Sequence, residues 1–214
     1  MREVYCIEPD GKAVWAYQLS NEHGDGPTDV PVLRLSPDGS LVYAYAPRTN
    51  GSLTALDAAS GAVRWTYRNS DYPLVTGAAV AGDGTVFLAL ATLDGAQRAD
   101  EASAEERLRQ ADAAIMTALG PDGKVLCGDT VDRSLDFDSG WMGGSIQFYQ
   151  GMVLAAGWCK LYAFTPQGEQ VWAMVLKDST QGTTCDGTAL RAVSASGKVF
   201  VISRKLFALA PEGP

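Results

Sequence analysis

The sequence has little of what common active sites and charged ligands require. Its 214 residues include one histidine and four cysteines, and they contain no Cys-x-x-Cys pair and no Gly-x-Ser-x-Gly motif. Zinc sites of ordinary spacing and nucleophilic catalytic triads are therefore not indicated. With 25 acidic against 17 basic residues the net charge is −8. Because Lys and Arg form no cluster, neither nucleic acid nor an anionic membrane surface is an expected partner.

Long apolar runs are missing too. No run approaches the roughly 18 residues that a membrane-spanning helix needs. Residues Met1 to Tyr5 lead directly into patterned sequence, so we expect no secretory signal in the chain as given, and an export signal would have to lie upstream. Glycine and proline are frequent instead, at 23 and 10 residues, which favours many turns and one large all-β domain.

A short unit recurs along the chain: apolar, any, small and apolar residues, then a polar turn with glycine, then an aromatic residue four positions later. Its five copies place the turn glycine at Gly11, Gly61, Gly123, Gly168 and Gly213. The aromatic position holds Trp15, Trp65 and Trp172, whereas the third copy has Cys127 there and the fifth ends before reaching it. We interpret these glycines and tryptophans as structural, with each tryptophan docking beside the small residue of the next copy.

A second hairpin signal with its own glycine lies between the copies, as in Ser36-Pro37-Asp38-Gly39. Asp-Gly pairs between β-branched and aromatic runs indicate hairpins, because the tight turn needs a positive φ. Since the turn glycines are 50, 62, 45 and 45 residues apart, each period predicts four strands, the size of one propeller blade. We predict a single domain over residues 1–214, with repeat copies near 4–19, 32–69, 78–130, 145–177 and 189–214.

The strand pattern gives a two-stranded start from Val4 to Leu19, three complete blades, and a three-stranded end from Ala189 to Leu209. We therefore predict an all-β propeller of four-stranded antiparallel blades, about four to five in number. Two alternatives stay open. Either the ends combine into one blade of an unusually small ring with one strand left over, or the chain is part of a larger propeller.

The stretch from Leu53 to Trp65, Leu-Thr-Ala-Leu-Asp-Ala-Ala-Ser-Gly-Ala-Val-Arg-Trp, resembles the tryptophan-docking repeat of the PQQ-like, or quinoprotein, β-propeller family. The resemblance extends over essentially the whole chain and implies that fold. The family includes quinone-dependent dehydrogenases, non-enzymatic assembly factors and sensor domains, and related propellers are often exported. The resemblance therefore chooses neither an activity nor a compartment.

Quinone-dependent alcohol dehydrogenases of this family place a disulfide between adjacent cysteines against the cofactor and hold calcium with carboxylate and amide oxygens. This sequence has no Cys-Cys pair, and no carboxylate constellation in it matches their base and calcium ligands. We therefore expect no cofactor and assign no catalytic residue. The alternative is a quinoprotein dehydrogenase, or part of one, that binds pyrroloquinoline quinone and calcium.

The four cysteines divide into two pairs. Cys6 occupies the small-residue position of the first copy and Cys127 the tryptophan position of the third, so we expect both to be buried core thiols. Cys159 and Cys185 fall outside the repeat. Either they form a disulfide or they are two free thiols, and a thiol count in denatured, unreduced protein distinguishes these alternatives.

Two segments are rich in oxygen-bearing side chains. His23 lies in a run of turn formers at residues 21–29, where a lone histidine makes no triad. Residues 129–138 hold four carboxylates, a density that suits calcium, but they lack the spacing of an EF-hand loop. We interpret both segments as solvated loops and expect no metal site.

The connection at residues 91–115 is expanded and has a helical pattern. Ser103 and Glu106 have the spacing of a capping box, and Leu108, Ala111 and Ile115 recur at helical intervals, which predicts a short helix near residues 100–112. Insertions in repeat proteins collect on one face, often the binding face. A tolerated surface excursion explains the segment equally well.

We therefore predict a non-enzymatic binding or scaffold module that contacts protein or small-molecule partners through the loops between blades and the insertion. An exposed Trp141, outside the repeat register, would be an anchor for a partner or a plug of the channel mouth. The candidate residues of this face are His23, Asp25, Glu105, Arg109, Asp132, Asp136, Asp138 and Trp141. Association with further copies of the chain stays open.

Overall fold

The computed structural model describes residues 2–19, 31–46, 52–72, 74–91, 114–127, 146–156, 160–167, 169–175, 189–193, 199–202 and 206–209. The regular elements in these residues are all β-strands, so none of them forms an apolar helix long enough to cross a membrane. In chain order the strands are β1 (Arg2–Ile7), β2 (Ala13–Leu19), β3 (Val32–Leu35), β4 (Leu41–Tyr45), β5 (Leu53–Asp57), β6 (Val63–Tyr67), β7 (Leu74–Val80), β8 (Val86–Ala91), β9 (Ala114–Leu119), β10 (Val125–Cys127), β11 (Ile146–Tyr149), β12 (Met152–Ala156), β13 (Lys160–Phe164), β14 (Gln170–Val175), β15 (Ala189–Val193), β16 (Val199–Ile202) and β17 (Leu206–Leu209).

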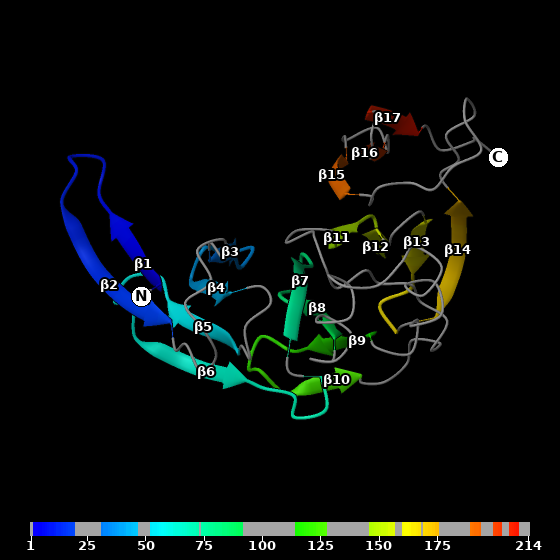
Figure 1. Ribbon diagram of the computed structural model, residues 1–214. Helices are drawn as coiled ribbons and strands as arrows, with labels where there is room; N and C mark the ends of the chain where they lie inside the picture. The colour runs from blue at the N-terminus through cyan, green and yellow to red at the C-terminus, as the bar shows by residue number, and fades with distance from the viewer. Residues whose placement is uncertain are drawn as a thin grey trace, which may run out of the picture.

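Within the described residues these strands form five antiparallel sheets (Figure 1). The first sheet is β1-β2, the second β3 to β6, the third β7 to β10, the fourth β11 to β14, and the fifth β15 to β17, each in sequence order. Strands adjacent in the sequence pair with each other, as expected of successive hairpins. The strand grouping is the one that the repeat predicts, and the prediction of an all-β propeller built from four-stranded blades is confirmed.

The sheets stand side by side along an open arc (Figure 1). Strands β3, β7, β11 and β15 contact one another in succession and lie on the inner side of the arc, whereas β2, β6, β10 and β14 lie on its outer side. The first sheet is at one end and the fifth at the other. The described strands therefore do not close a ring.

Apolar side chains fill the space between successive sheets. Tyr43 and Leu53 of the second sheet belong to one buried cluster with Leu119 of the third. Phe87 of the third sheet stacks on Phe148 of the fourth, with ring centroids 5.6 Å apart. Because a single blade cannot bury both of its faces, this stacking supplies most of the hydrophobic stabilisation of the array.

Trp15 on β2 joins the first sheet to the second. Its indole Nε1 donates a hydrogen bond to the carbonyl of Ala58 at 3.0 Å, and its ring lies over Gly61, where an added Cβ would come within 2.6 Å of the ring. The small residue Cys6 is instead the cross-strand partner of Trp15 in its own sheet. The tryptophan thus docks on the turn of the next copy, and not beside its small residue as the sequence suggested.

Trp65 on β6 repeats this contact one sheet further along. Its Nε1 donates to the carbonyl of Pro121 at 2.9 Å, and its ring lies over Gly123. In the third copy the shorter Cys127 places its Sγ 3.7 Å from the carbonyl of Pro166. In each copy of the repeat, the carbonyl that accepts this contact lies three residues after the copy's small residue. The contact between successive sheets therefore recurs with the repeat.

Two of the cysteines are less buried than the sequence predicts. Cys6 and Cys127 are free thiols but half-buried, so the expectation of fully buried thiols is wrong. Both lie on outermost strands of their sheets, β1 and β10, which have a neighbouring strand on one side only. Gly168, Gly213 and the helix expected near residues 100–112 lie outside the described residues.

Candidate binding face

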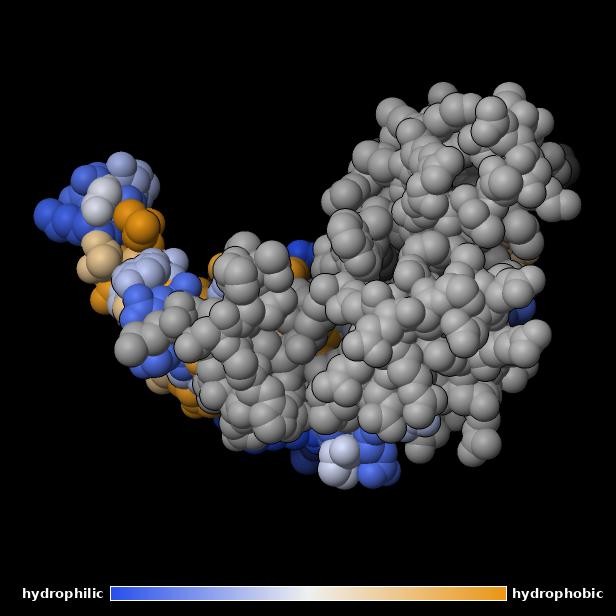
Figure 2. All heavy atoms as spheres, viewed as in Figure 1, coloured by the Kyte–Doolittle hydropathy of each residue, from blue (hydrophilic) through white to orange (hydrophobic). Residues whose placement is uncertain are grey.

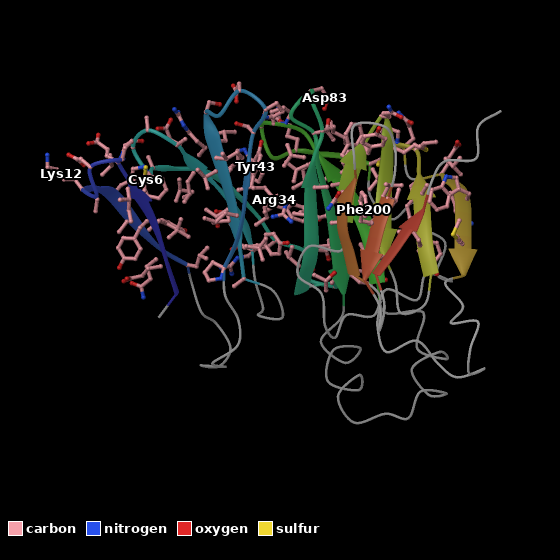
Figure 3. All side chains as sticks on the ribbon, turned by 90° about the horizontal axis from the view of Figure 1, so that it is seen from above. Cys6, Lys12, Arg34, Tyr43, Asp83 and Phe200 are labelled. Carbon is pink, nitrogen blue, oxygen red and sulfur yellow. The ribbon has the colours of Figure 1, made fainter. Side chains whose placement is uncertain are left out.

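The arc has two different edges. Because consecutive strands are antiparallel, successive connections fall at alternate edges. The turns from β1 to β2, β3 to β4, β5 to β6, β7 to β8 and β9 to β10 lie at the edge that Lys12 and Asp83 mark in Figure 3, which we call the turn edge. The connections from each sheet to the next start and end at the opposite edge, which we call the loop edge.

Aspartates of the turn edge serve their own turns. Each accepts a hydrogen bond from a backbone N–H two or three residues further on, at 2.9 to 3.2 Å. They are Asp10, Asp38, Asp57, Asp83 and Asp122. Hydrogen bonds led by that of the Ser36 hydroxyl lower the pKa of Asp38 to about 2. Those of the Ser60 hydroxyl and of Arg64 lower the pKa of Asp57 to about 2. These carboxylates are bound within the turns, so we assign them no ligand.

The longest connections leave from the loop edge. They join β2 to β3, β8 to β9, β10 to β11 and β14 to β15, at residues 20–31, 92–113, 128–145 and 176–188. All the candidate residues of the predicted face fall in them: His23, Asp25, Glu105, Arg109, Asp132, Asp136, Asp138 and Trp141. These residues, with Cys159 and Cys185, lie outside the described residues. The strand ends that flank the four segments share one edge, and the arrangement of the side chains stays a prediction.

No metal centre is assembled by the part of the chain that the structure describes. In it, no three His, Cys, Asp or Glu side chains come together as possible ligands. Calcium takes six to eight oxygen ligands, whereas the aspartates of the turn edge belong to separate turns. The described residues therefore do not fit the calcium that holds pyrroloquinoline quinone in the family's dehydrogenases, and the expectation that no cofactor binds stays a prediction.

Arg34 is a residue that the sequence did not single out. From the inner strand β3, its Nε donates to the carbonyl of Ala78 on β7 at 3.2 Å, and its Nη1 donates to the carbonyl of Leu33 at 3.0 Å. Burial raises the pKa of the nearby Tyr45 to about 12, against the opposing effect of the Arg34 charge. The sequence did contain a signal for Arg34, because this charged residue stands between Leu33 and Leu35 in an otherwise apolar strand. Because the guanidinium joins two inner strands, it positions the sheets.

Comparison with protein families matches residues 1–140 to the family described as outer membrane protein assembly factor BamB. No curated protein sequence matches the chain. Many solved structures are similar in fold, including the following three. BamB from Moraxella catarrhalis has a TM-score of 0.52 and 18% identity, and the match covers 94% of this chain and 53% of that one.

Sqt1 from Saccharomyces cerevisiae has a TM-score of 0.57 and 12% identity, with 98% of this chain and 53% of that one covered. BBS1N, solved in complex with ARL6DN, has a TM-score of 0.50 and 11% identity, with 94% and 55% covered. The chain thus spans about half the length of these structures. Since the family match covers well over half of the sequence, the chain belongs to the PQQ-like β-propeller family of the outer membrane protein assembly factor BamB.

Proposed function

We propose that the chain is a non-enzymatic scaffold module that binds a protein partner along its loop edge. The observation that carries this proposal is the contrast between the two edges. The described turn edge consists of short turns closed by glycine and aspartate, whereas the four longest connections leave from the loop edge. Binding residues concentrate on loops that a rigid framework positions.

The framework has the rigidity that such a surface needs. Trp15 and Trp65 bridge successive sheets through indole hydrogen bonds, and Arg34 links two inner strands. An edge that extends over several sheets suits the broad footprint of a protein better than the concave site of a small molecule. The description of the matched family as an assembly factor, and the solution of the similar BBS1N in a complex, support a protein partner.

The test compares alanine variants of the two edges. One variant replaces His23, Asp136 and Trp141, which belong to connections that leave from the loop edge. The matched control replaces Lys12 and Lys124, whose side chains are 80% and 82% exposed on the turn edge. Circular dichroism verifies that both are folded, and capture from a lysate of the source organism, with cross-linking and mass spectrometry, identifies the partner.

We expect wild type and the control to retain the same protein and the loop-edge variant to bind it at least tenfold more weakly. Equal binding by all three chains would contradict the loop edge as the binding surface.

A titration with pyrroloquinoline quinone and Ca²⁺, followed by dye-linked oxidation of alcohols and sugars, tests the enzymatic alternative. We expect neither saturable binding nor turnover. Saturable binding together with turnover would replace the scaffold proposal with a quinoprotein dehydrogenase.

A further inference from the structure

The first sheet corresponds to the outer half of a blade. Gly11 and Trp15 occupy the repeat positions of Gly61 and Trp65, so β1 and β2 are equivalent to β5 and β6. In the second sheet, β3 and β4 complete the blade on the inner side of β5. Among the described strands, none pairs with the inner edge of β1. A row of backbone N–H and C=O groups is thus open to another strand.

One face of β1 is exposed although it has the residues of a buried strand. Tyr5 and Ile7 are 53% and 61% exposed, whereas Thr54 and Leu56, their equivalents on β5, are 2% and 0% exposed. Figure 2 shows hydrophobic residues on the surface of the arm that β1 and β2 form. This face lacks the cover that the preceding sheet gives to β5.

The inner strand of the second sheet is exposed in the same region. Leu33 and Leu35 on β3 are 43% and 63% exposed. Their equivalents on β7 are Ala78, which is fully buried, and Val80, which packs against the cluster between the second and third sheets. We call the inner edge of β1, together with Leu33 and Leu35, the first-sheet notch. A two-stranded antiparallel hairpin fits it, because one strand would pair with β1 and the other would cover β3.

The chain itself contains such a hairpin at its other end. Strands β15 and β16 pair antiparallel and occupy the repeat positions of β3 and β4, and β17 follows as the equivalent of β5 and of β1. The sequence Leu206-Phe207-Ala208-Leu209 of β17 has the pattern of Val4-Tyr5-Cys6-Ile7 of β1. The chain therefore has two strands suited to the same position beside β16.

We propose that a second copy of this chain fills the first-sheet notch, with β1 of one copy taking the place of β17 beside β16 of the other. Each joined blade then consists of β15 and β16 from one copy and β1 and β2 from its partner. Such an exchange of equivalent strands forms a closed, two-fold symmetric dimer.

The turn after β1 supports this arrangement. Gly61 and Gly123 are each covered by a tryptophan of the preceding sheet, whereas nothing lies within 4 Å of a Cβ added to Gly11. In the joined blade, the preceding sheet is the fourth sheet of the other copy, whose outer strand carries Trp172. The turn at Gly11 would then receive that tryptophan, and the docking contact would recur at the joint.

The first test is the native mass of the full chain, measured by light scattering on a sizing column. We expect twice the 22.6 kDa chain mass. Leu35→Glu should weaken the dimer at least tenfold, because full burial of a leucine alone corresponds to about one to two powers of ten in affinity. Leu126→Glu is the matched control, since Leu126 is 61% exposed on β10, outside the notch; it should leave the dimer unchanged. A monomeric wild type, an open polymer, or a dimer insensitive to Leu35→Glu would overturn the proposal.

A second test fixes the strand register. Phe200 of β16 pairs with Ala208 of β17, so an exchanged β1 places Cys6 opposite Phe200 of the other copy. In one chain these residues belong to the first and fifth sheets, which lie at the two ends of the arc (Figure 1), and Figure 3 shows them well apart. Cross-strand Cα distances of about 4.5 to 5.5 Å permit a disulfide. Phe200→Cys should therefore give a covalent dimer under mild oxidation, and adding Cys6→Ala should abolish it. A bridge within one chain, or dimers without a Cys6-dependent bridge, would contradict the strand exchange.

Discussion

Gly61→Ala should destabilise the protein much more than Gly39→Ala. The two glycines have nearly the same backbone conformation, with φ of +71° and +72°. A non-glycine residue in this left-handed region costs about 1–2 kcal/mol at either position. A Cβ on Gly39 meets nothing within 4 Å, whereas a Cβ on Gly61 would lie 2.6 to 2.9 Å from three ring atoms of Trp15.

The Trp15 ring has little freedom to move away. Its Nε1 is bonded to the carbonyl of Ala58, and the ring packs against a cluster that includes Leu56 and Val42. Forcing a methyl group into such a contact costs about 1–3 kcal/mol. We therefore expect a total loss of about 2–5 kcal/mol for Gly61→Ala against about 1–2 kcal/mol for Gly39→Ala.

Urea unfolding followed by circular dichroism measures this difference. With a slope of about 2 kcal/mol per molar, the midpoint of Gly61→Ala should lie about 0.5 to 1.5 M below that of Gly39→Ala. In a Trp15→Ala background the two glycine variants should become equal, because the contact between methyl and ring is then absent. Gly123 and Gly151, with φ of +80° and +79°, form a second matched pair with Trp65 over Gly123 alone. Equal midpoints within both pairs would refute the docking of tryptophan on the turn.

Three further predictions concern the same framework. Trp65→Phe removes the hydrogen bond to the carbonyl of Pro121 and should lower the free energy of unfolding by about 0.5–1.5 kcal/mol; an unchanged urea midpoint would show that this bond contributes nothing. The Tyr43 hydroxyl is buried without a hydrogen-bond partner in the described part of the chain, so Tyr43→Phe should preserve or raise the melting temperature, and a clear fall would reveal a partner. Asp38 and Asp57 have pKa values of about 2, below those of an unfolded chain, so their contribution is complete above about pH 4. It should be lost as the pH falls from about 4 to 2, and Asp57→Asn should make the urea midpoint less sensitive to pH in that interval.

Local pattern was sufficient to predict the strands and their grouping. The alternation of apolar residues and the Asp-Gly turns act over a few residues, because a hairpin depends on its own turn and its adjacent strands. The turn at Gly61 and the strand that leads to Trp65 were therefore identified from the sequence alone. The interpretation of residues 129–138 as a solvated loop and the helix predicted near residues 100–112 had no such local support from hairpins, and both stay predictions.

The sequence by itself determined that this protein consists of β-hairpins in blade-sized repeats, since every signal for them is local. Tertiary structure alone decided what each tryptophan touches: Trp15 reaches the turn at Gly61, 46 positions along the chain, a contact set by the stacking of two sheets. It also decided that Arg34 bridges β3 to β7 and that Leu33 and Leu35 are exposed while their equivalents on β7 are covered. Strands with the same sequence pattern differ in burial because different sheets lie beside them. Which sheet lies beside a strand depends on packing between residues that are far apart in the sequence.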